Sequence, residues 1–515
     1  MNTLSSHFLL NIDRQPIQAT DPTALRTQCL NAPGQAISSA WLAMAGRQTV
    51  NTTEHRTATH WAYRLAANPA IAQQLPHGGL EEETQALAAQ RTLAQAAQTG
   101  QLNNPEGQPY QAIVHLGIGG SDLGPRLLND VFSRLQLPSI YTLRFAANVD
   151  FHELQWALRG LNPKTTLVLI ASKSFSTRET LLNANHVVQW LTAGAGKAYA
   201  QAALIAATSN PKKAHEFGIH PDRIFAFPDS VGGRFSVWGP VSLSLRMAYG
   251  NQVLDDFLAG GTHVDHHALT TPLPDNLPAL LALTDRDRLQ RGIQSLMVCA
   301  YDSRLGLLVP YLQQLWMESL GKGVSTRGEV LSAPPCPLLW GGTGTNNQHA
   351  FFQMLHQAPI ACGIELVGIA NPNHTQTSHH QALLSHFLAQ AQAFATGQYN
   401  TESERLNPAI NAKTCPGGRP VTSLLIAQLS PFTLGGLLAL WEYRTTALAA
   451  LQSINPFDQF GVELGKTIAG NLEQVLATTA KAHPEANHGT PASDTLNPTT
   501  ARLIDGLQSM QQQVP

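Results

Sequence analysis

Short apolar runs that stop in Ser, Gly or Asn recur along the first half of the chain. They begin at Ala112, Tyr141, Thr165, Ala203 and Ile224, and helical stretches separate them. Continuous apolar runs of this length are typical of strands in a parallel sheet that is covered on both faces. The pattern predicts a doubly wound α/β half.

A second series of apolar runs begins at Cys336, Ile364 and Val421, with helical stretches near residues 376–397 and 431–452. It predicts a second doubly wound half of the same class. Residues 1 to about 60 are rich in Ala and Gln at helical spacing, so we expect a helical opening region. The last residues are rich in Pro, Thr, Asn and Ala, and we expect a mobile tail up to a final short helix.

These patterns divide the chain into five parts. They are a helical N-terminal region (1–75), a first α/β domain (76–250), a helical connecting segment (251–300), a second α/β domain (301–480) and a C-terminal tail (481–515).

Composition narrows the classes of partner. Among 515 residues, 32 Lys and Arg stand against 34 Asp and Glu, so no strong field favours nucleic acid or an anionic membrane. The five cysteines are far apart and form no CxxC pair, which indicates a reducing cytoplasm rather than a disulfide framework or a cysteine zinc site. We find no basic leader and no apolar run of about 18 residues, so we expect no membrane partner.

The loop after the first predicted strand is rich in glycine. Gly117 and Gly119 start a dinucleotide fingerprint, but Asp122 takes the place of its third glycine, which argues against a nicotinamide cofactor. Gly119, Gly120 and Ser121 then lie at a predicted helix N-terminus, where amides and a hydroxyl can hold an anion. The alternative is a tight turn with a helix cap.

The loop after the third predicted strand, SKSFSTRET, places several hydroxyls ahead of a helix. Ser172, Ser174, Ser176 and Thr177 offer donors for one compact phosphate. Ser176 and Glu179 also have the spacing of a capping box, and we expect that local role even if phosphate binds.

Nucleotide and metal motifs are incomplete. A Walker A loop has a glycine five residues before its Gly-Lys pair, and Trp316 and Phe460 occupy those positions here. No HExxH motif accompanies the histidines, so we predict no metal site.

Four further residues stand in unusual settings, although each alone is better explained as structural: Arg234, Glu318, His349 and Lys466. Glu318 follows three apolar residues. A carboxylate held against apolar groups has its pKa raised toward neutrality, as a general base requires.

Six segments occur in an order that is specific: GIGGSDLGP, SKSFSTRETLLNA, DSVGGRFSVWG, MESLGKG, GTNNQHAFFQMLHQ and NPFDQFGVELGK. From about residue 110 to 470 the chain resembles the phosphoglucose isomerase family. The resemblance implies two sugar isomerase domains, each a three-layer αβα sandwich with a mainly parallel sheet. It also implies a cytoplasmic homodimer whose active site lies near the subunit interface.

The family interconverts glucose 6-phosphate and fructose 6-phosphate, in glycolysis and gluconeogenesis, without a cofactor. The route is ring opening followed by a cis-enediol intermediate. By resemblance, Glu318 is the base that moves a proton between C1 and C2, and Arg234 stabilises the charge on the enediolate oxygens. His349, contributed by the partner subunit, and Lys466 assist ring opening.

The resemblance also assigns the residues that bind substrate. Gln314 and Gln459 position sugar hydroxyls. The phosphate is held by Gly120, Ser121, Ser172, Lys173, Ser174, Ser176 and Thr177.

The chain departs from the family pattern at a few positions. Leu320 and the pair Gly342-Thr343 replace the usual residues of two motifs, without removing a proposed catalytic group. Serine stands at 174 and 176 where threonine is common, and Pro456 replaces a serine close to Gln459. We expect altered affinity before lost activity.

Three other functions fit parts of the sequence. A non-catalytic sugar-phosphate sensor would retain phosphate binding without chemistry, and the retained Arg234, Glu318, His349 and Lys466 argue against it. An amidotransferase-linked isomerase would need an N-terminal nucleophilic cysteine, whereas the first cysteine here is Cys29. An isomerase of broader range that also accepts mannose 6-phosphate stays open.

Overall fold

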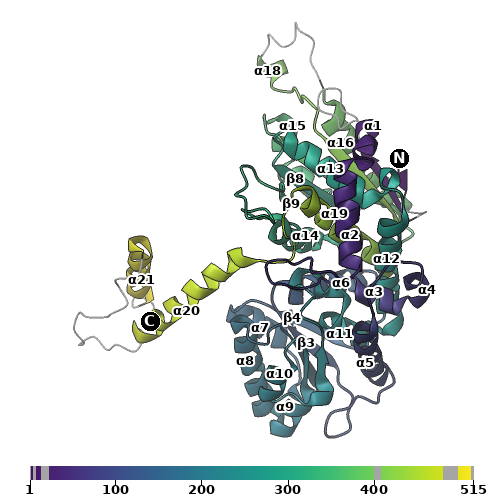
Figure 1. The fold of residues 1–515 in the computed structure, drawn as a ribbon. Helices are drawn as coiled ribbons and strands as arrows, with labels where there is room; N and C mark the ends of the chain where they lie inside the picture. Colours follow the sequence, from purple (N-terminus) through teal and green to yellow (C-terminus); the bar gives the residue numbers. More distant parts are fainter. Residues whose placement is uncertain (1, 4–6, 13–21, 399–407, 480–496, 512–515) are drawn as a thin grey trace. The chain divides into compact units, whose positions relative to one another are not determined.

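The computed structural model divides into two compact units, one ending at Asp458 and one beginning at Gln459. The first unit contains both sheets (Figure 1). The structure describes residues 2–3, 7–12, 22–398, 408–479 and 497–511. The tail segment that was predicted to be mobile, up to residue 497, lies almost wholly outside the described residues. The domain boundaries at 75, 250, 300 and 480 stay predictions.

The first sheet has five parallel strands in the order β4-β3-β5-β6-β7. Every strand predicted for the first half is present: β3 (Ala112–Leu116), β4 (Thr142–Ala146), β5 (Thr166–Ala171), β6 (Leu204–Thr208) and β7 (Ile224–Ala226). The strand order reverses at β3, which pairs with β4 on one side and β5 on the other. In open parallel sheets, ligands bind beyond the carboxyl ends of the strands at such a reversal.

Helices cover both faces of this sheet. Figure 1 shows α7 and α8 on one side of β3 and β4, and α5 and α11 on the other. The helices of this part are α5 (Glu81–Gln98), α6 (Gly120–Arg134), α7 (Phe151–Leu158), α8 (Arg178–Ala195), α9 (Lys197–Ala203), α10 (Pro211–Glu216) and α11 (Leu243–Tyr249). The doubly wound prediction is confirmed for this half.

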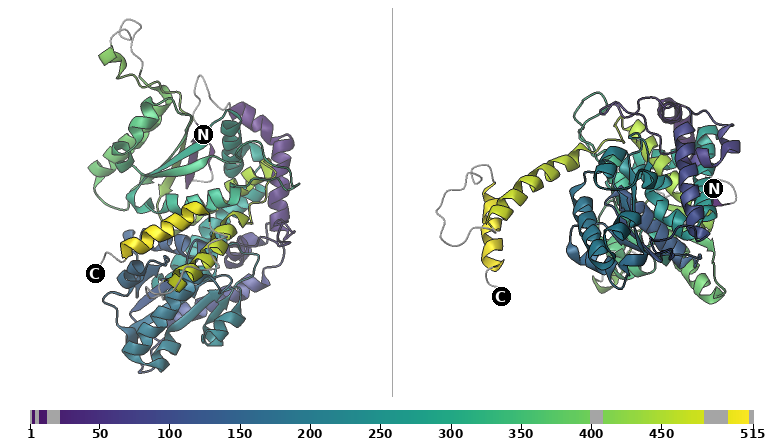
Figure 2. Two further views of the ribbon diagram at one scale, coloured as in Figure 1. Left: turned by 90° about the vertical axis from the view of Figure 1, so that its left-hand side faces the viewer. Right: turned by 90° about the horizontal axis from the view of Figure 1, so that it is seen from below.

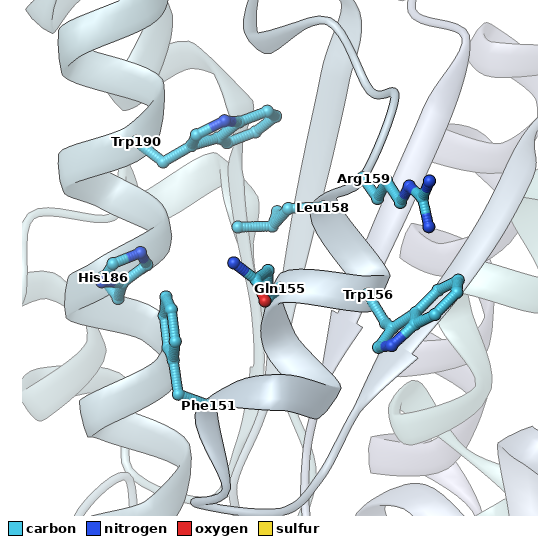
Figure 3. A pocket seen from close by; sticks show the side chains of 7 residues that line it. All are labelled: Phe151, Gln155, Trp156, Leu158, Arg159, His186 and Trp190. Carbon is cyan, nitrogen blue, oxygen red and sulfur yellow. The ribbon is translucent and has the colours of Figure 1, made fainter. Parts of the chain in front are cut away.

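An aromatic pocket of about 600 Å³ lies along α7 and α8 (Figure 3). Phe151 and His186 meet edge to face across it, with ring centroids 4.7 Å apart. The other lining residues are Gln155, Trp156, Leu158, Arg159 and Trp190. The pocket contains none of the residues predicted to bind substrate.

The second sheet has the order β1-β2-β11-β10-β8-β9. The predicted strands are present as β9 (Leu338–Thr343), β10 (Gly363–Asn371) and β11 (Val421–Gln428), and they run parallel with β8 (Ser295–Tyr301). A short ribbon, β1 (Asn2–Thr3) and β2 (Phe8–Ile12), adds antiparallel to β11.

Two expectations about helical segments are wrong. Residues 295–300 were assigned to a helical connection, yet they form β8, an almost fully buried strand inside the sheet. A short apolar run carries no period that separates a buried strand from a buried helix. Phe8–Ile12 were assigned to a helical opening, yet they pair with β11 and cover that edge of the sheet.

Helices pack around this second sheet and beside it, and Figure 2 shows the N-terminal ones in purple next to the second half. Those of the opening and connecting segments are α1 (Pro22–Cys29), α2 (Ala32–Ala45), α3 (Ala62–Ala67), α4 (Pro69–Ala72), α12 (Asn251–Thr270) and α13 (Leu277–Gln290). The later ones are α14 (Leu308–Gln313), α15 (Phe352–Gln357), α16 (Thr377–Thr396), α18 (Pro408–Asn411) and α19 (Pro431–Leu451). The second unit contains α20 (Glu463–Thr479) and α21 (Pro498–Gln511).

Helix α19 is buried on nearly every side and packs against α2, α12 and α13. It approaches α12 closely at two glycines. A Cβ atom on Gly260 would come 1.7 Å from the carbonyl oxygen of Phe432, and one on Gly435 would come 1.9 Å from that of Phe257. The two backbones touch only because both residues lack a side chain.

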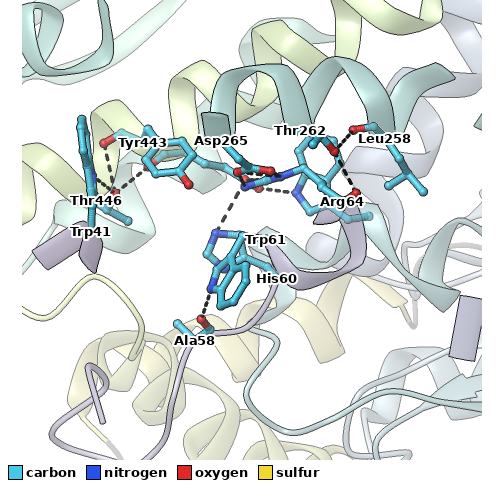
Figure 4. A network of polar contacts seen from close by, with 12 residues as sticks. Trp41, Ala58, His60, Trp61, Arg64, Leu258, Thr262, Asp265, Tyr443 and Thr446 are labelled. Atoms are coloured by element: carbon cyan, nitrogen blue, oxygen red, sulfur yellow. Dashed lines mark hydrogen bonds and ion pairs between the residues drawn. The ribbon is translucent and has the colours of Figure 1, made fainter. Parts of the chain in front are cut away.

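A buried ionic cluster joins α3, α12 and α19 (Figure 4). Arg64 donates to Asp265 at 2.6 and 2.9 Å and also to Glu442, whose other oxygen accepts from Trp238 Nε1 at 2.7 Å. The Arg64 guanidinium lies 4.4 Å from the Trp238 ring. Burial raises the pKa of Glu442 to about 7, with Arg64 opposing the shift. The cluster fixes the N-terminal helices to the centre of the fold.

No helix among the described residues is long and apolar enough to cross a bilayer.

Candidate active site

The first predicted anion site lies at the carboxyl end of β3, where the strand order reverses. Helix α6 begins at Gly120, as the sequence predicted, and Gly119 before it has a φ of 59°. No side chain caps the start of this helix. Ser121 is half-buried there, and its carbonyl accepts from His115 Nε2 at 2.8 Å.

Gly120 lies directly against the backbone of the Arg234 loop. A Cβ atom at this position would come 1.9 Å from the carbonyl oxygen of Gly233 and 2.6 Å from the amide nitrogen of Arg234. Only glycine fits such a contact. The GIGGSD and SVGGRF segments therefore lie in direct backbone contact at this point.

The four predicted hydroxyls occupy the loop between β5 and α8, at the same edge of the sheet. Ser172 Oγ donates to Thr177 Oγ1 at 3.2 Å, and Ser176 Oγ donates to Ser174 Oγ at 2.8 Å. Between them Phe175 has a φ of 47°, and its buried ring packs on Phe217. A left-handed conformation is uncommon for a bulky residue, and such conformations cluster at active sites and ligand-binding loops.

The capping box predicted for Ser176 and Glu179 is wrong. Helix α8 begins at Arg178 with Thr177 as its N-cap, and no side chain caps it. The turn at Phe175 delays the helix by one residue and directs the Ser176 hydroxyl toward Ser174. The hydroxyls of this loop are therefore not used to cap the helix.

Lys173 connects this loop to the neighbouring one. Its Nζ donates to the carbonyl oxygen of Asp229 at 2.6 Å, and burial lowers the pKa of its ammonium group. Its own carbonyl accepts from Thr208 Oγ1 and Ser209 Oγ. Lys173 is thus held at the edge of the hydroxyl loop.

Arg234 follows the first sheet in a 3-10 helix over Gly233–Trp238 and is 3% exposed. Its Nε donates to Ser319 Oγ at 2.6 Å. Its Nη2 donates to the carbonyl oxygens of Pro456 and Asp458, the latter at 3.0 Å. Burial lowers the pKa of the guanidinium group, and Glu318 and Asp458 oppose this effect.

Glu318 ends a π-helix over Gln314–Glu318 that continues α14. One carboxylate oxygen lies 3.6 Å from Arg234 Nη1, and the side chain is 20% exposed. At the other end of the same π-helix, Gln314 Nε2 would come within 2.9 Å of a Cβ atom on Gly119. π-Helical turns are rare and are frequently found at functional sites.

The structure therefore brings together four of the residues predicted in the first unit, Gly120, Arg234, Gln314 and Glu318. Gly120 contacts the Arg234 loop, Gln314 contacts the turn before Gly120, and Glu318 faces Arg234. These residues come from the start of α6, the 3-10 helix and the π-helix, so a small polar molecule beside them would meet a carboxylate, a guanidinium and amide groups together.

The structure does not test the roles predicted for His349, Gln459 and Lys466. His349 ends a 3-10 helix over Asn346–His349 and is exposed. Gln459 and Lys466 belong to the second unit, where Lys466 Nζ pairs with Glu463 at 3.1 Å. Their roles stay predictions.

Two residues at the site were missed from the sequence. Lys322 Nζ donates to Asp458 Oδ1 at 2.7 Å and to the Asp458 carbonyl, which also accepts from Arg234. Both residues lie inside recognised segments, MESLGKG and NPFDQF. No spacing rule connects them, because the contact joins parts of the chain that are distant in sequence.

The residues that depart from the family pattern are accommodated by their surroundings in the structure. Leu320 is fully buried. Gly342 leaves room for Asn347, whose amide lies 2.8 Å from the position of a Cβ atom there. Pro456 accepts from Arg234 through its carbonyl, a contact that needs no N–H group.

Among the described residues, no group of three or more His, Cys, Asp or Glu could hold a metal ion.

Known proteins match this chain over most of its length. The sequence model described as "Phosphoglucose isomerase" matches residues 21–493. A glucose-6-phosphate isomerase of Caulobacter vibrioides is 37% identical over 505 residues, covering 95% of this chain and 90% of that protein. One of Burkholderia pseudomallei is 39% identical over 462 residues, covering 88% and 83%.

Solved structures agree with this assignment. The crystal structure of a glucose-6-phosphate isomerase from Chlamydia trachomatis superposes with a TM-score of 0.81 at 28% identity, covering 97% of this chain and 92% of that one. A hypothetical protein from Thermus thermophilus superposes with a TM-score of 0.67 at 26% identity, covering 90% and 99%. The two α/β halves are sugar isomerase domains, and the chain belongs to the phosphoglucose isomerase family.

Proposed function

We propose that the protein is a glucose-6-phosphate isomerase, which interconverts glucose 6-phosphate and fructose 6-phosphate in glycolysis and gluconeogenesis. The observation that carries this proposal is the pair formed by Glu318 and Arg234 at the edge of the sheets, 3.6 Å apart, in a chain of this family. A carboxylate beside a buried guanidinium supplies a base and a cation for one carbon–oxygen centre.

The proposed chemistry is a proton shuttle between neighbouring carbons. Glu318 removes the proton from C2 of open-chain glucose 6-phosphate, and the C–H electron pair forms the C1=C2 double bond. The carbonyl electrons move onto O1, where Arg234 stabilises the negative charge. The proton on O2 passes to O1, the O2–H electron pair forms the C2=O bond, and the electrons of the C1=C2 bond take the proton back from Glu318 at C1, which gives fructose 6-phosphate.

Substrate binding is assigned to the loops around this pair. The hydroxyl loop and the start of α6 are proposed to hold the phosphate through Gly120, Ser121, Ser172, Lys173, Ser174, Ser176 and Thr177. Gln314 positions a sugar hydroxyl from the π-helix, which its contact with the turn at Gly119 supports. Gln459 is proposed to position another hydroxyl, and His349 and Lys466 to assist ring opening.

The direct test incubates the protein with fructose 6-phosphate in EDTA and without nucleotide, and then measures the glucose 6-phosphate formed in a separate second step. Turnover supports the proposal. Binding of fructose 6-phosphate without turnover would contradict it and favour a sensor. Mannose 6-phosphate in a parallel reaction measures whether the substrate range is broader.

The phosphate assignment predicts a change in KM. Replacing Ser176 by alanine removes one hydroxyl donor from the exposed part of the loop, which caps no helix. We expect KM for fructose 6-phosphate to rise about tenfold, because a hydrogen bond to a charged group is lost. The value of kcat should change less than about twofold, since the phosphate does not react.

The matched control is Ser133→Ala, which removes an exposed hydroxyl from the far part of α6. Its steady-state constants should equal those of the wild type. A rise in KM for both variants, or a fall in kcat for Ser176→Ala alone, would remove Ser176 from the phosphate site.

We also propose a cytoplasmic homodimer in which His349 completes the site of the partner subunit. The exposure of His349 and the five free cysteines are compatible with this proposal.

The shared site predicts complementation between inactive variants. A dimer that combines Glu318→Gln with His349→Asn has one site with both substitutions and one site with neither. Co-expression of the two variants should therefore give mixed dimers, which two different affinity tags identify. With random pairing, half of the dimers are mixed and each has one intact site, so the pool should regain about one quarter of the wild-type activity. Inactive mixed dimers would show that each subunit supplies its own histidine.

A further inference from the structure

The Arg234 guanidinium is fixed from several directions. Ser319 binds its Nε, Glu318 faces its Nη1, and the carbonyl oxygens of Pro456 and Asp458 accept from its Nη2. A guanidinium with a fixed orientation can stabilise a developing oxyanion without reorganising during the reaction. Whatever holds the loop at Pro456–Asp458 therefore also sets the position of Arg234.

That loop is held by the side chain of Asp458. Its Oδ1 accepts from Lys322 Nζ at 2.7 Å. Its Oδ2 accepts from Thr53 Oγ1 at 2.6 Å and from Asn455 Nδ2 at 2.9 Å. Asn455 Nδ2 also reaches Asn51 Oδ1 at 2.9 Å, so the loop is joined to the N-terminal segment as well.

The carbonyl oxygen of Asp458 is shared by two cations. Arg234 Nη2 and Lys322 Nζ both donate to it, so the two positive side chains lie against the same peptide group. Such an arrangement is repulsive unless an anion lies beside it. The Asp458 carboxylate, which is 8% exposed, is that anion.

The charges of the group balance. Arg234 and Lys322 carry two positive charges, and Glu318 and Asp458 carry two negative ones. When Glu318 takes the substrate proton, its charge is lost and a negative charge arises on the substrate oxygen. Asp458 is the carboxylate of this group that no step of the proposed reaction protonates.

We infer that Asp458 and Lys322 are positioning residues of the isomerisation, which hold Arg234 against Glu318 and set the charge around this pair. Neither residue is assigned a contact with substrate. The inference rests on the proposed function. Glu54 and Lys173 are the other charged groups that act on Arg234.

Opposite substitutions test the inference through the pH dependence of kcat/KM. Asp458→Asn removes a negative charge near Glu318, which favours the ionised form of this base. The acidic limb of the pH profile of kcat/KM should therefore move to lower pH. Lys322→Met removes a positive charge, so the limb should move to higher pH. Each shift should be about 0.5 to 1 pH unit, measured between about pH 5 and pH 9.

The same variants should separate kcat from KM. Because Arg234 is misplaced rather than removed, we expect kcat to fall about 10- to 100-fold in Asp458→Asn, with KM within about threefold of the wild type. Lys322→Arg keeps the charge and should keep the limb in place. Thr53→Val removes a hydrogen bond to Asp458 without changing charge, and its limb should not move.

A merely structural role would lower activity in all variants without opposite shifts of the acidic limb. That result, or shifts in the same direction for Asp458→Asn and Lys322→Met, would overturn the inference. If Asp458→Asn does not fold, the position of the acidic limb in Lys322→Met, compared with that in Lys322→Arg, decides whether the inference holds. A wild-type protein without isomerase activity would overturn the proposed function and the inference with it, whereas an active wild type with unmoved limbs overturns the inference alone.

Discussion

Replacing Glu318 by glutamine is expected to lower kcat for isomerisation by about 10²- to 10⁴-fold, the usual contribution of a general base. The amide keeps the size of the side chain, and its oxygen can still face Arg234 Nη1, which lies 3.6 Å from the carboxylate. It cannot take a proton from carbon. Binding of fructose 6-phosphate, measured by calorimetry, should therefore change little.

The proton step can be measured separately from the overall reaction. In D₂O the wild-type protein should exchange the C2 hydrogen of glucose 6-phosphate with solvent, and Glu318→Gln should not. Glu329→Gln, an exposed glutamate in the next loop, serves as the matched control and should behave as wild type. Turnover of Glu318→Gln at the wild-type rate would remove this residue from the mechanism.

Replacing Arg64 by methionine is expected to destabilise the protein by about 3 to 5 kcal/mol, the usual cost of breaking a buried ion pair by removing one partner. Methionine fills a similar space but leaves Asp265 and Glu442 buried without their cation. The midpoint of urea unfolding measures the effect. Arg134→Met, which breaks an exposed pair with Asp130, should cost at most about 1 kcal/mol.

The destabilisation should also depend on pH. Burial raises the pKa of Glu442 to about 7 and raises the pKa of Asp265, and Arg64 opposes both shifts. A carboxyl group whose pKa is raised in the folded state stabilises the fold while it is protonated. This contribution to stability is lost as the pH rises through the folded-state pKa. The loss in Arg64→Met should thus be larger at about pH 8 than at about pH 5. Adding Asp265→Asn and Glu442→Gln should restore part of the stability, and no recovery would contradict the explanation.

The strands of both sheets were predictable from sequence where apolar runs end in small polar residues. β3 and β5 show this most clearly, since they are buried throughout and each is followed by a loop of Gly or Ser. β8 was not predicted, because a buried run such as SLMVCAY carries no alternation. β2 was not predicted, because its partner β11 lies near the other end of the chain.

At the site, the sequence indicated which residues to consider but not how they are held. The start of α6 was predictable from its glycines, whereas the start of α8 was not, because a left-handed Phe175 shifts it past the capping box. The π-helix that ends at Glu318 has no sequence signature. The contact of Lys322 with Asp458 depends on tertiary structure alone.

The strand at Phe8–Ile12 also constrains the order in which the protein can be assembled during synthesis. Its hydrogen-bonding partner, Val421–Gln428, is among the last parts of the first unit to be translated. The five strands at residues 112–226 pair only with one another, so the first sheet can form while the ribosome is still making the second. The strand at Phe8–Ile12 cannot pair until nearly the whole chain has been synthesised. Formation of this long-range pairing is therefore the step at which a nascent chain is most exposed to misassembly.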